Sequence, residues 1–271
     1  MLISSHLSPD YHEPDQVPIP FVILSQPRTG STLVCSLLSS HPSIRALVEP
    51  INPLGHSHHM KPIKGSKCLL PEAMVQTNLP RALRLLFDRK PPPEKWVLSR
   101  KEAPKAAGFK IMAHQLMALK SEPVFWQYLV DHKIKVILVF RYNTVMQYIS
   151  DLIVQKTYQP TCWDGDIKTA QVKVPIESLE KNLRRIMMEK RYLVKKVTEL
   201  GLEKRRLKYE DFKDDITPVS RLIPWLIGER APLTTKLSKQ NPDSMRARVK
   251  NYNELVRELQ RLNLDHLIVD N

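Results

Sequence analysis

Apolar and polar positions follow two different rhythms along the chain. Short continuous apolar runs, typical of buried strands, occupy residues 21–25, 106–112 and 134–140. After the first and the third of these runs, apolar residues recur at the spacing of one helix face. Strands that alternate with helices predict an α/β fold, in which a central parallel sheet is flanked by helices.

The other segments complete this outline. An irregular stretch rich in proline and histidine is expected over residues 41–71, and a strand within residues 205–212. Asn143 is expected to cap the helix that follows the 134–140 strand. Further helices are expected over residues 72–87, 124–132, 179–197 and 241–260.

Length and composition fit a single domain over residues 1–271, with an irregular N-terminal segment at 1–19. Of the 271 residues 42% are hydrophobic, which is enough for a packed core. No run approaches the roughly 18 apolar residues of a membrane span, and the polar start lacks the apolar centre of a signal peptide. The three cysteines are widely spaced and form no disulfide framework, so we expect a cytoplasmic protein.

The net charge of +14 would attract phosphate, sulfate, nucleic acid or an acidic membrane surface. Much of this charge lies between Lys181 and Arg206, on the outer face of the long amphipathic helix. That face is either simply solvated or in peripheral contact with an acidic partner. Arginines and aromatic residues do not interleave as they do in nucleic-acid motifs, so no nucleic acid is expected.

The turn after the first strand carries the most specific chemistry, in the sequence Pro27-Arg28-Thr29-Gly30-Ser31-Thr32. A helix N-terminus presents free backbone N–H groups, and a glycine lets the backbone approach a ligand. Arg28 adds a permanent cation, and the hydroxyl residues add donors. Arg141 directly follows the 134–140 run, and ligands of open parallel sheets bind beyond such strand ends. Both segments could therefore face one ligand.

Other interpretations of these residues remain open. The hydroxyl residues would also cap an ordinary helix after a strand. No lysine follows Gly30, so the spacing of the nucleoside-triphosphate P-loop is missing and a metal-nucleotide kinase is disfavoured. His56, His58 and His59 are close in sequence, but no partner set has zinc spacing, and we expect no metal.

The stretch QPRTGSTLVCSLLSSHPSI resembles the 5'-phosphosulfate loop of sulfotransferases that use 3'-phosphoadenosine-5'-phosphosulfate (PAPS). The similarity is greatest to the bacterial carbohydrate branch, which includes the nodulation-factor and trehalose enzymes. Further segments resemble this family in the expected order: EPINPLG, GFKIMAHQL, VILVFRYNTVMQYIS, LKYEDF and KQNPDSMRARVKNYNEL. The resemblance covers about residues 20–260 and implies a P-loop-like, three-layer α/β fold.

The resemblance also implies roles for single residues. Around the 5'-phosphate and the transferring sulfuryl group it places Arg28, Thr29, Gly30, Ser31 and Thr32. Arg141 and Ser150 would hold the 3'-phosphate, and a strand-end arginine with a hydroxyl about two turns along the next helix can reach one anion from two sides. Relatives often have two adjacent arginines where this chain has Arg141-Tyr142, and this departure puts the affinity for the 3'-phosphate in question.

Sulfuryl transfer also needs a base for the acceptor hydroxyl. Glu49 stands where the family places its catalytic acidic residue, and no lysine or arginine is adjacent in the sequence. Alternatively, Glu49 caps the local backbone. His114 is the rival base, because cytosolic small-molecule sulfotransferases use a histidine after the equivalent lysine-bearing strand. Lys110 on that strand is either an anion contact or a surface charge at a strand end.

These observations together predict a PAPS-dependent sulfotransferase that releases 3'-phosphoadenosine-5'-phosphate (PAP). The expected acceptor is a hydroxyl of a carbohydrate or a glycolipid-like molecule. The main alternative is a non-catalytic or degenerate anion-binding protein of the same fold, and a P-loop kinase is the less favoured one.

Overall fold

The structure is a computed structural model that describes residues 17–51, 78–87, 104–161, 168, 170–237 and 244–269. Within these residues, five strands form one sheet in the order β2-β3-β1-β4-β5. The strands are β1 (Ile19–Ser25), β2 (Ile44–Val48), β3 (Ala106–Met112), β4 (Lys135–Phe140) and β5 (Lys204–Lys208). Every neighbouring pair is parallel. The predicted α/β fold with a central parallel sheet is therefore confirmed.

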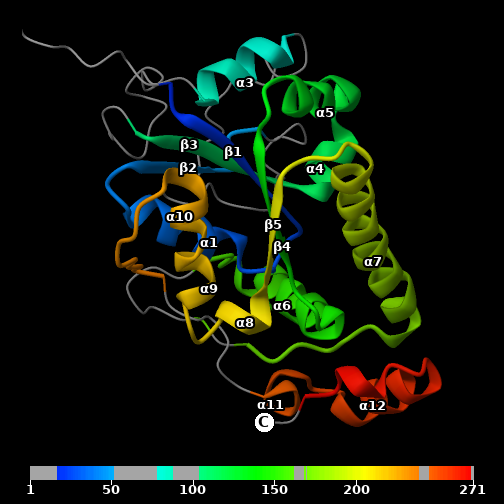
Figure 1. Ribbon diagram of the computed structural model, residues 1–271. Coiled ribbons are helices and arrows are strands. Elements are labelled where there is room, and N and C mark those ends of the chain that lie inside the picture. The colour runs from blue at the N-terminus through cyan, green and yellow to red at the C-terminus, as the bar shows by residue number, and fades with distance from the viewer. Residues whose placement is uncertain are drawn as a thin grey trace, which may run out of the picture.

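Helices connect the strands and cover the sheet on both faces (Figure 1). The helices of the first half are α1 (Ser31–Ser40), α3 (Leu79–Phe87), α4 (Ala113–Ala118), α5 (Glu122–Asp131) and α6 (Thr144–Thr157). Those of the second half are α7 (Ile176–Glu199), α8 (Tyr209–Phe212), α9 (Thr217–Ser220), α10 (Leu222–Ile227), α11 (Met245–Arg248), α12 (Tyr252–Arg261) and the 3-10 helix η2 (Asp265–Leu267).

The two faces of the sheet belong to two apolar cores. On β1, Val22 and Leu24 pack with residues of α3, α4, α5 and α7. Phe21 and Ile23 point the other way and pack with residues of α1 and α8 to α10. All four of these β1 residues are fully buried, because helices cover both faces of a parallel sheet.

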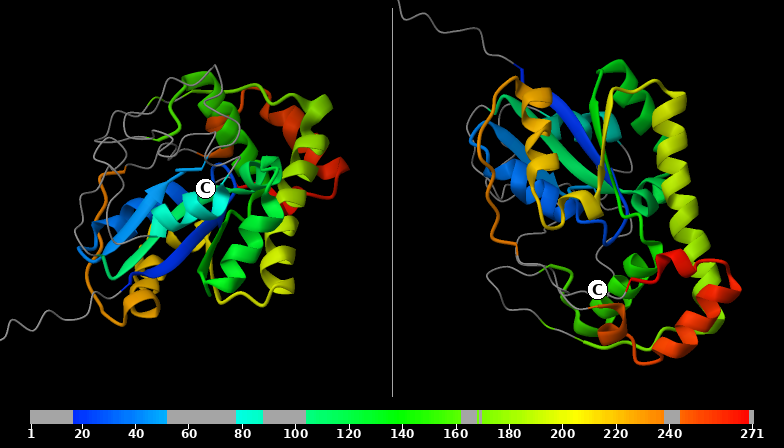
Figure 2. Two further views of the ribbon diagram at one scale, coloured as in Figure 1. Left: turned by 90° about the horizontal axis from the view of Figure 1, so that it is seen from above. Right: turned by 60° about the horizontal axis from the view of Figure 1, so that its bottom comes forward.

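A third apolar cluster joins the C-terminal segment to α6 and to the first half of α7. Figure 2 shows α12 beside the early turns of α7, where Arg261 pairs with Glu180. Asn143, just before α6, donates through Nδ2 to the carbonyl of Leu267 at 2.7 Å. The 3-10 helix η2 is thereby fixed next to the turn that follows β4.

Several expected elements are confirmed, and others are corrected. The 106–112 strand has the expected bounds, and Asn143 caps α6 by accepting from the backbone N–H of Met146 at 2.9 Å. The expected irregular stretch 41–71 is wrong at residues 44–48, which form β2. Arg45 interrupts that strand's apolar pattern, although its side chain is fully buried and donates to the carbonyl of Leu86.

Two further corrections concern the second half. Within the expected strand 205–212, only the residues up to Lys208 are extended, and the next four form helix α8. The expected C-terminal helix is divided into α11 and α12. Residues 52–77, which include His56, His58 and His59, lie outside the described residues, and so does the first part of the expected 72–87 helix.

Candidate active site at the carboxyl ends of the strands

The site residues expected from the sequence follow the carboxyl ends of four adjacent strands. Arg28 comes after β1, Glu49 after β2, His114 after β3 and Arg141 after β4. In the sheet order, the chain leaves β1 toward β2 and leaves β4 toward β5. The neighbours β1 and β4 therefore form a topological switch point, where open parallel sheets bind their ligands.

The turn between β1 and α1 depends on glycine at its last position. Gly30 is the N-cap of α1, with a left-handed φ of 78°. A Cβ atom at this position would lie 2.7 Å from a ring carbon of Tyr209, so no larger residue fits without a shift. The hydroxyl of Thr29 donates to the carbonyl of Gln26 at 2.9 Å and closes the turn. Glycine is thus required both by the backbone conformation and by the approach of α8.

The side chain of Arg28 contacts Ser150, although the resemblance described above implies different phosphates for these two residues. Its Nε donates to Ser150 Oγ on α6 at 3.1 Å, and its Nη1 donates to the carbonyl of Pro160. Burial lowers the pKa of Arg28 to about 10, attraction to Asp151 opposes this shift, and repulsion from Arg141 adds to it. At neutral pH, Arg28 is therefore a cation close to a second cation.

Arg141 is the second cation of the site. Its Nε is buried and has no hydrogen-bond partner among the described residues. Its guanidinium lies over the ring of Tyr209, 4.6 Å from the ring centre. Burial lowers the pKa of Arg141, while attraction to the Tyr209 and Glu210 side chains opposes the shift. A buried N–H group without a partner costs free energy of folding. An anion at this position would accept a hydrogen bond from the N–H group and would also pair with the positive charge of the guanidinium.

The segment between β4 and α6 is held by Glu210 of α8, the short helix that follows the neighbouring strand β5. Glu210 accepts from the backbone N–H of Tyr142 through both carboxylate oxygens, at 3.0 Å each, and from that of Asn143 at 3.1 Å. The side chain of Tyr142 is 62% exposed and faces solvent. Glu210 was not foreseen from the sequence.

Glu49 and Lys110 form the opposite half of the site. Glu49 has a left-handed φ of 48°, and its Oε1 lies 2.6 Å from Lys110 Nζ. Lys110 also donates to Thr32 Oγ1 at 3.0 Å, and Gln115 Nε2 donates to Glu49 Oε2 at 3.1 Å. Burial alone would raise the pKa of Glu49, but attraction to Lys110 and these hydrogen bonds outweigh it and hold the pKa below its usual value.

This pair corrects two expectations. Glu49 has no basic neighbour in the sequence, but the adjacent strand supplies one in space. Lys110 is only 3% exposed, so its interpretation as a surface charge is wrong. The sequence did contain a signal, since Lys110 interrupts an otherwise apolar buried strand, and a buried lysine requires a partner.

His114 lies on α4, one residue before Gln115. Its Nδ1 is buried and has no hydrogen-bond partner among the described residues. Burial lowers the pKa of His114, although the carboxylates of Glu189 and Glu49 act in the opposite direction. The imidazole is therefore neutral at pH 7 and can accept a proton, as can the ionised Glu49.

Two further polar side chains, Gln26 and Gln147, were not singled out in the sequence, because their partners are carbonyl groups of distant segments. Gln26, fully buried after β1, donates to the carbonyl of Ile186 at 2.6 Å and lies 3.5 Å from a carboxylate oxygen of Glu189. Gln147 of α6 donates to the carbonyl of Pro27 at 2.8 Å. These contacts attach α6 and α7 to the β1 turn and fix the walls of the site.

Other features lie apart from these residues. An open groove of about 770 Å³ runs between α6, the start of α7 and α12, and is lined by residues such as Leu152, Pro175 and Arg257. Across the parts of the chain that the structure describes, no three or more His, Cys, Asp or Glu side chains gather as a metal site would require. None of the helices described there has both the length and the apolar character of a membrane span.

Comparisons with known proteins add little to this picture. No family model and no curated protein matches the chain. Among solved structures, the crystal structure of a sulfotransferase from Alicyclobacillus acidocaldarius is similar, with 15% sequence identity and a TM-score of 0.49. The match covers 94% of this chain and 96% of that chain. We draw no argument about function from a likeness at this level.

Proposed function

We propose that the chain is a PAPS-dependent sulfotransferase that acts on a hydroxyl of a carbohydrate or glycolipid-like acceptor. The observation that carries this proposal is the meeting of Arg28, Ser150 and Arg141 at the switch point between β1 and β4. Two half-buried guanidiniums that repel each other favour a ligand with more than one anionic group. PAPS has such groups at both ends of its ribose.

The residues of the β1 turn and of α6 fit this ligand. Arg28, Gly30 and the start of α1 would bind the 5'-phosphosulfate, because a helix N-terminus and a cation both stabilise an anion. Arg141 would bind the 3'-phosphate with its buried Nε, and Ser150 would be shared between Arg28 and this group. PAPS supplies the sulfuryl group, and the cations stabilise the charge that develops on the leaving phosphate.

On the other side of β1, Glu49 or His114 would take the proton of the acceptor hydroxyl. Both are in the proton-accepting form at neutral pH, since the pKa of each lies below its usual value. Lys110 holds Glu49 and also contacts Thr32 of the β1 turn, so it links the proposed base to the proposed sulfuryl site. We keep Glu49 as the first candidate and His114 as the second.

One observation favours the non-catalytic alternative. Glu49 is already neutralised by Lys110, and an ion-paired carboxylate of lowered pKa is a weaker base than a free one. A protein that binds PAP without turnover would keep the Arg28 and Arg141 contacts and would need no base.

A ligand-binding experiment tests the first part of the proposal. PAP should raise the melting temperature of the protein clearly more than ATP with magnesium, because a ligand that binds only the folded state stabilises it. Arg28→Ala should abolish most of this shift, whereas Arg184→Ala, on the exposed face of α7, serves as a control for the loss of one charge. Equal stabilisation of the wild-type protein by PAP and by ATP with magnesium would refute the assignment.

An activity screen then separates the enzyme from the binding protein. The wild-type protein should transfer labelled sulfate from PAPS to at least one hydroxyl acceptor in a panel of sugars and glycolipids, and Arg28→Ala should lower the rate by about 10² to 10³, as the loss of one charge-stabilising donor does. Binding of PAP without transfer to any of these acceptors would favour the non-catalytic alternative.

A further inference from the structure

The short helix α8 touches both anion-binding turns. The rings of Tyr209 and Phe212 pack against Gly30, where an added Cβ would lie 2.7 Å from the first ring and 3.1 Å from the second. The Tyr209 ring also supports the guanidinium of Arg141 at 4.6 Å. Four residues that follow the edge strand β5 therefore connect the β1–α1 turn with the β4–α6 turn.

Glu210 makes the firmest of these connections. Three hydrogen bonds, of 3.0, 3.0 and 3.1 Å, join its carboxylate to the two consecutive backbone N–H groups that precede α6. Asn143 Oδ1 takes the N–H of Met146 in the first turn of the same helix. Three donors at this helix start, the N–H groups of Tyr142, Asn143 and Met146, are thus already bound to side chains of the protein. Under the proposed function, Arg141 and Ser150 are the side chains that would bind the phosphate beside them.

We propose that Glu210 is a positioning residue for the 3'-phosphate site. Its carboxylate acts as a built-in anion that fixes the backbone of Tyr142 and Asn143, and through this backbone it directs the guanidinium of Arg141. Tyr209 supports the same guanidinium from below through its ring. This inference rests on the proposed function, because it assigns Arg141 to a phosphate of PAPS.

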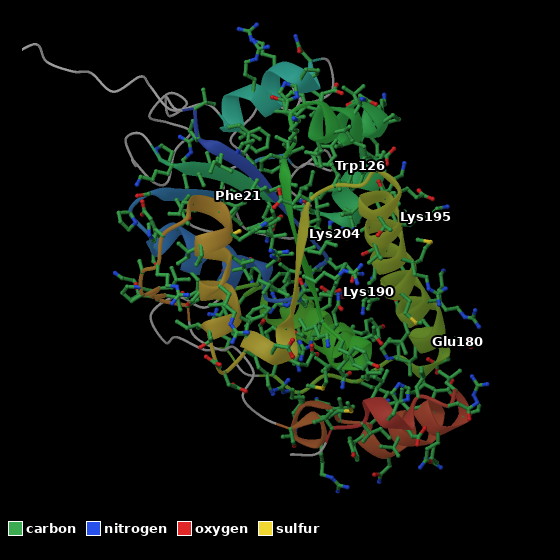
Figure 3. All side chains as sticks on the ribbon, viewed as in Figure 1. Phe21, Trp126, Glu180, Lys190, Lys195 and Lys204 are labelled. Atoms are coloured by element: carbon green, nitrogen blue, oxygen red, sulfur yellow. The ribbon has the colours of Figure 1, made fainter. Side chains whose placement is uncertain are left out.

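The charges around Glu210 agree with this role. Besides Arg141, the carboxylate is close enough to Lys190 of α7 to oppose the burial that lowers the pKa of that lysine. Lys190 in turn lies over the rings of Phe140 and Tyr142, at 5.5 and 5.6 Å from the ring centres, on the side of the sheet that α7 covers (Figure 3). The carboxylate of Glu210 thus attracts both cations, while it accepts hydrogen bonds from the backbone of Tyr142 and Asn143.

The test compares two acids on one strand–helix unit. Glu210→Ala should weaken binding of PAP by about tenfold or more, because a misdirected group loses most of its contact with the ligand. It should change binding of adenosine 5'-monophosphate, which lacks the 3'-phosphate, by less than about twofold. Glu203→Ala is the matched control, since Glu203 lies just before β5 and accepts from Trp225 far from the site.

Two further variants separate positioning from folding. Glu210→Gln keeps an oxygen that accepts one backbone N–H, so it should recover part of the affinity for PAP that Glu210→Ala loses. Tyr209→Phe keeps the ring beneath Arg141 and should bind PAP like the wild-type protein, whereas Tyr209→Leu should not. If Glu210 had a structural role alone, its loss would weaken the binding of PAP and of adenosine 5'-monophosphate equally. That result would overturn the proposal.

An increase in the affinity for PAP in Glu210→Ala would also overturn the proposal. If Glu210→Ala binds PAP more tightly than the wild-type protein, then the carboxylate competes with the phosphate for the two N–H groups. Hydrogen exchange of the Tyr142 and Asn143 amides tests the positioning without any nucleotide: exchange should accelerate in Glu210→Ala and not in Glu203→Ala. Should wild-type PAP binding fail, the proposed function falls, and unchanged exchange in Glu210→Ala would separately refute the role of Glu210.

Discussion

The two halves of the candidate site handle their charges in opposite ways. Glu49, just after β2, and Lys110 of β3 neutralise each other at 2.6 Å, and Thr32 and Gln115 complete the pair. Arg141, just after β4, lies over an aromatic ring and is attracted to Glu210, but its buried Nε has no hydrogen-bond partner among the described residues. The first half is balanced within the protein, whereas the second half gains most from an external anion.

Under the proposed function, this difference would separate chemistry from binding. Lys110 and Gln115 hold the carboxylate of Glu49 in place, as a proposed base requires. The buried Nε of Arg141 keeps a donor that a proposed anion could use. Arg28, with its left-handed φ of 62°, lies between the halves and donates to α6. Backbone strain of this kind is typical of functional sites.

The largest expected effect tests the balanced half. Glu49→Gln cannot accept a proton, so turnover with a confirmed acceptor should fall by about 10² to 10⁴, while PAP binds as in the wild-type protein. His114→Asn should lower turnover much less. Steady-state rates together with PAP titrations measure both effects. If His114→Asn proves inactive and Glu49→Gln remains active, the two assignments must be exchanged.

An intermediate effect tests the anion-binding half. Arg141→Ala should weaken the binding of PAP by about 1.5 to 3 kcal/mol, which is the usual contribution of a hydrogen bond to a charged group. Binding of adenosine-5'-phosphosulfate, which lacks the 3'-phosphate, should change far less. Calorimetric titration of both ligands makes the comparison. An equal loss for the two would assign Arg141 a structural role and remove the contrast between the halves.

The smallest effect concerns the contribution of the Glu49–Lys110 pair to the unfolding free energy of the protein. The pKa of Glu49 is lower in the folded protein than in the unfolded chain, so the pair stabilises the fold above the ordinary glutamate pKa of about 4.3. This contribution, on the order of 1 kcal/mol, should disappear as the pH falls through the lower folded value. Denaturant unfolding of the wild-type protein and of Glu49→Gln should therefore differ at pH 7 and converge under acid conditions.

The exposed acid Glu229, which pairs with Lys105 at the surface, gives the control for this measurement. Glu229→Gln should leave the unfolding free energy nearly unchanged at both pH values, because surface pairs contribute little. A Glu49→Gln protein as stable as the wild-type protein at pH 7 would show that the buried pair contributes nothing to folding.

Much of the fold could be predicted from hydrophobic patterns. The strands around 21–25, 106–112 and 134–140 were visible because helices cover them on both sides, which leaves continuous apolar runs. β2 was missed, since the buried Arg45 breaks its pattern and its burial depends on a carbonyl of α3 that only the folded chain brings close. The YEDF segment was read as strand because four residues are too few for a helical period.

The sequence by itself determined that Arg28, His114 and Arg141 lie near one edge of the sheet, because the strands before them are visible as apolar runs and the carboxyl ends of parallel strands share one edge. Glu49 joins them only because β2, which the pattern did not reveal, ends just before it. Only the tertiary structure decided how these residues are paired. The order of the strands placed Lys110 beside Glu49 and Glu210 beside Asn143, although dozens of residues separate each pair in the chain. Such contacts depend on the distances that packing of the two faces imposes, and no local pattern records them.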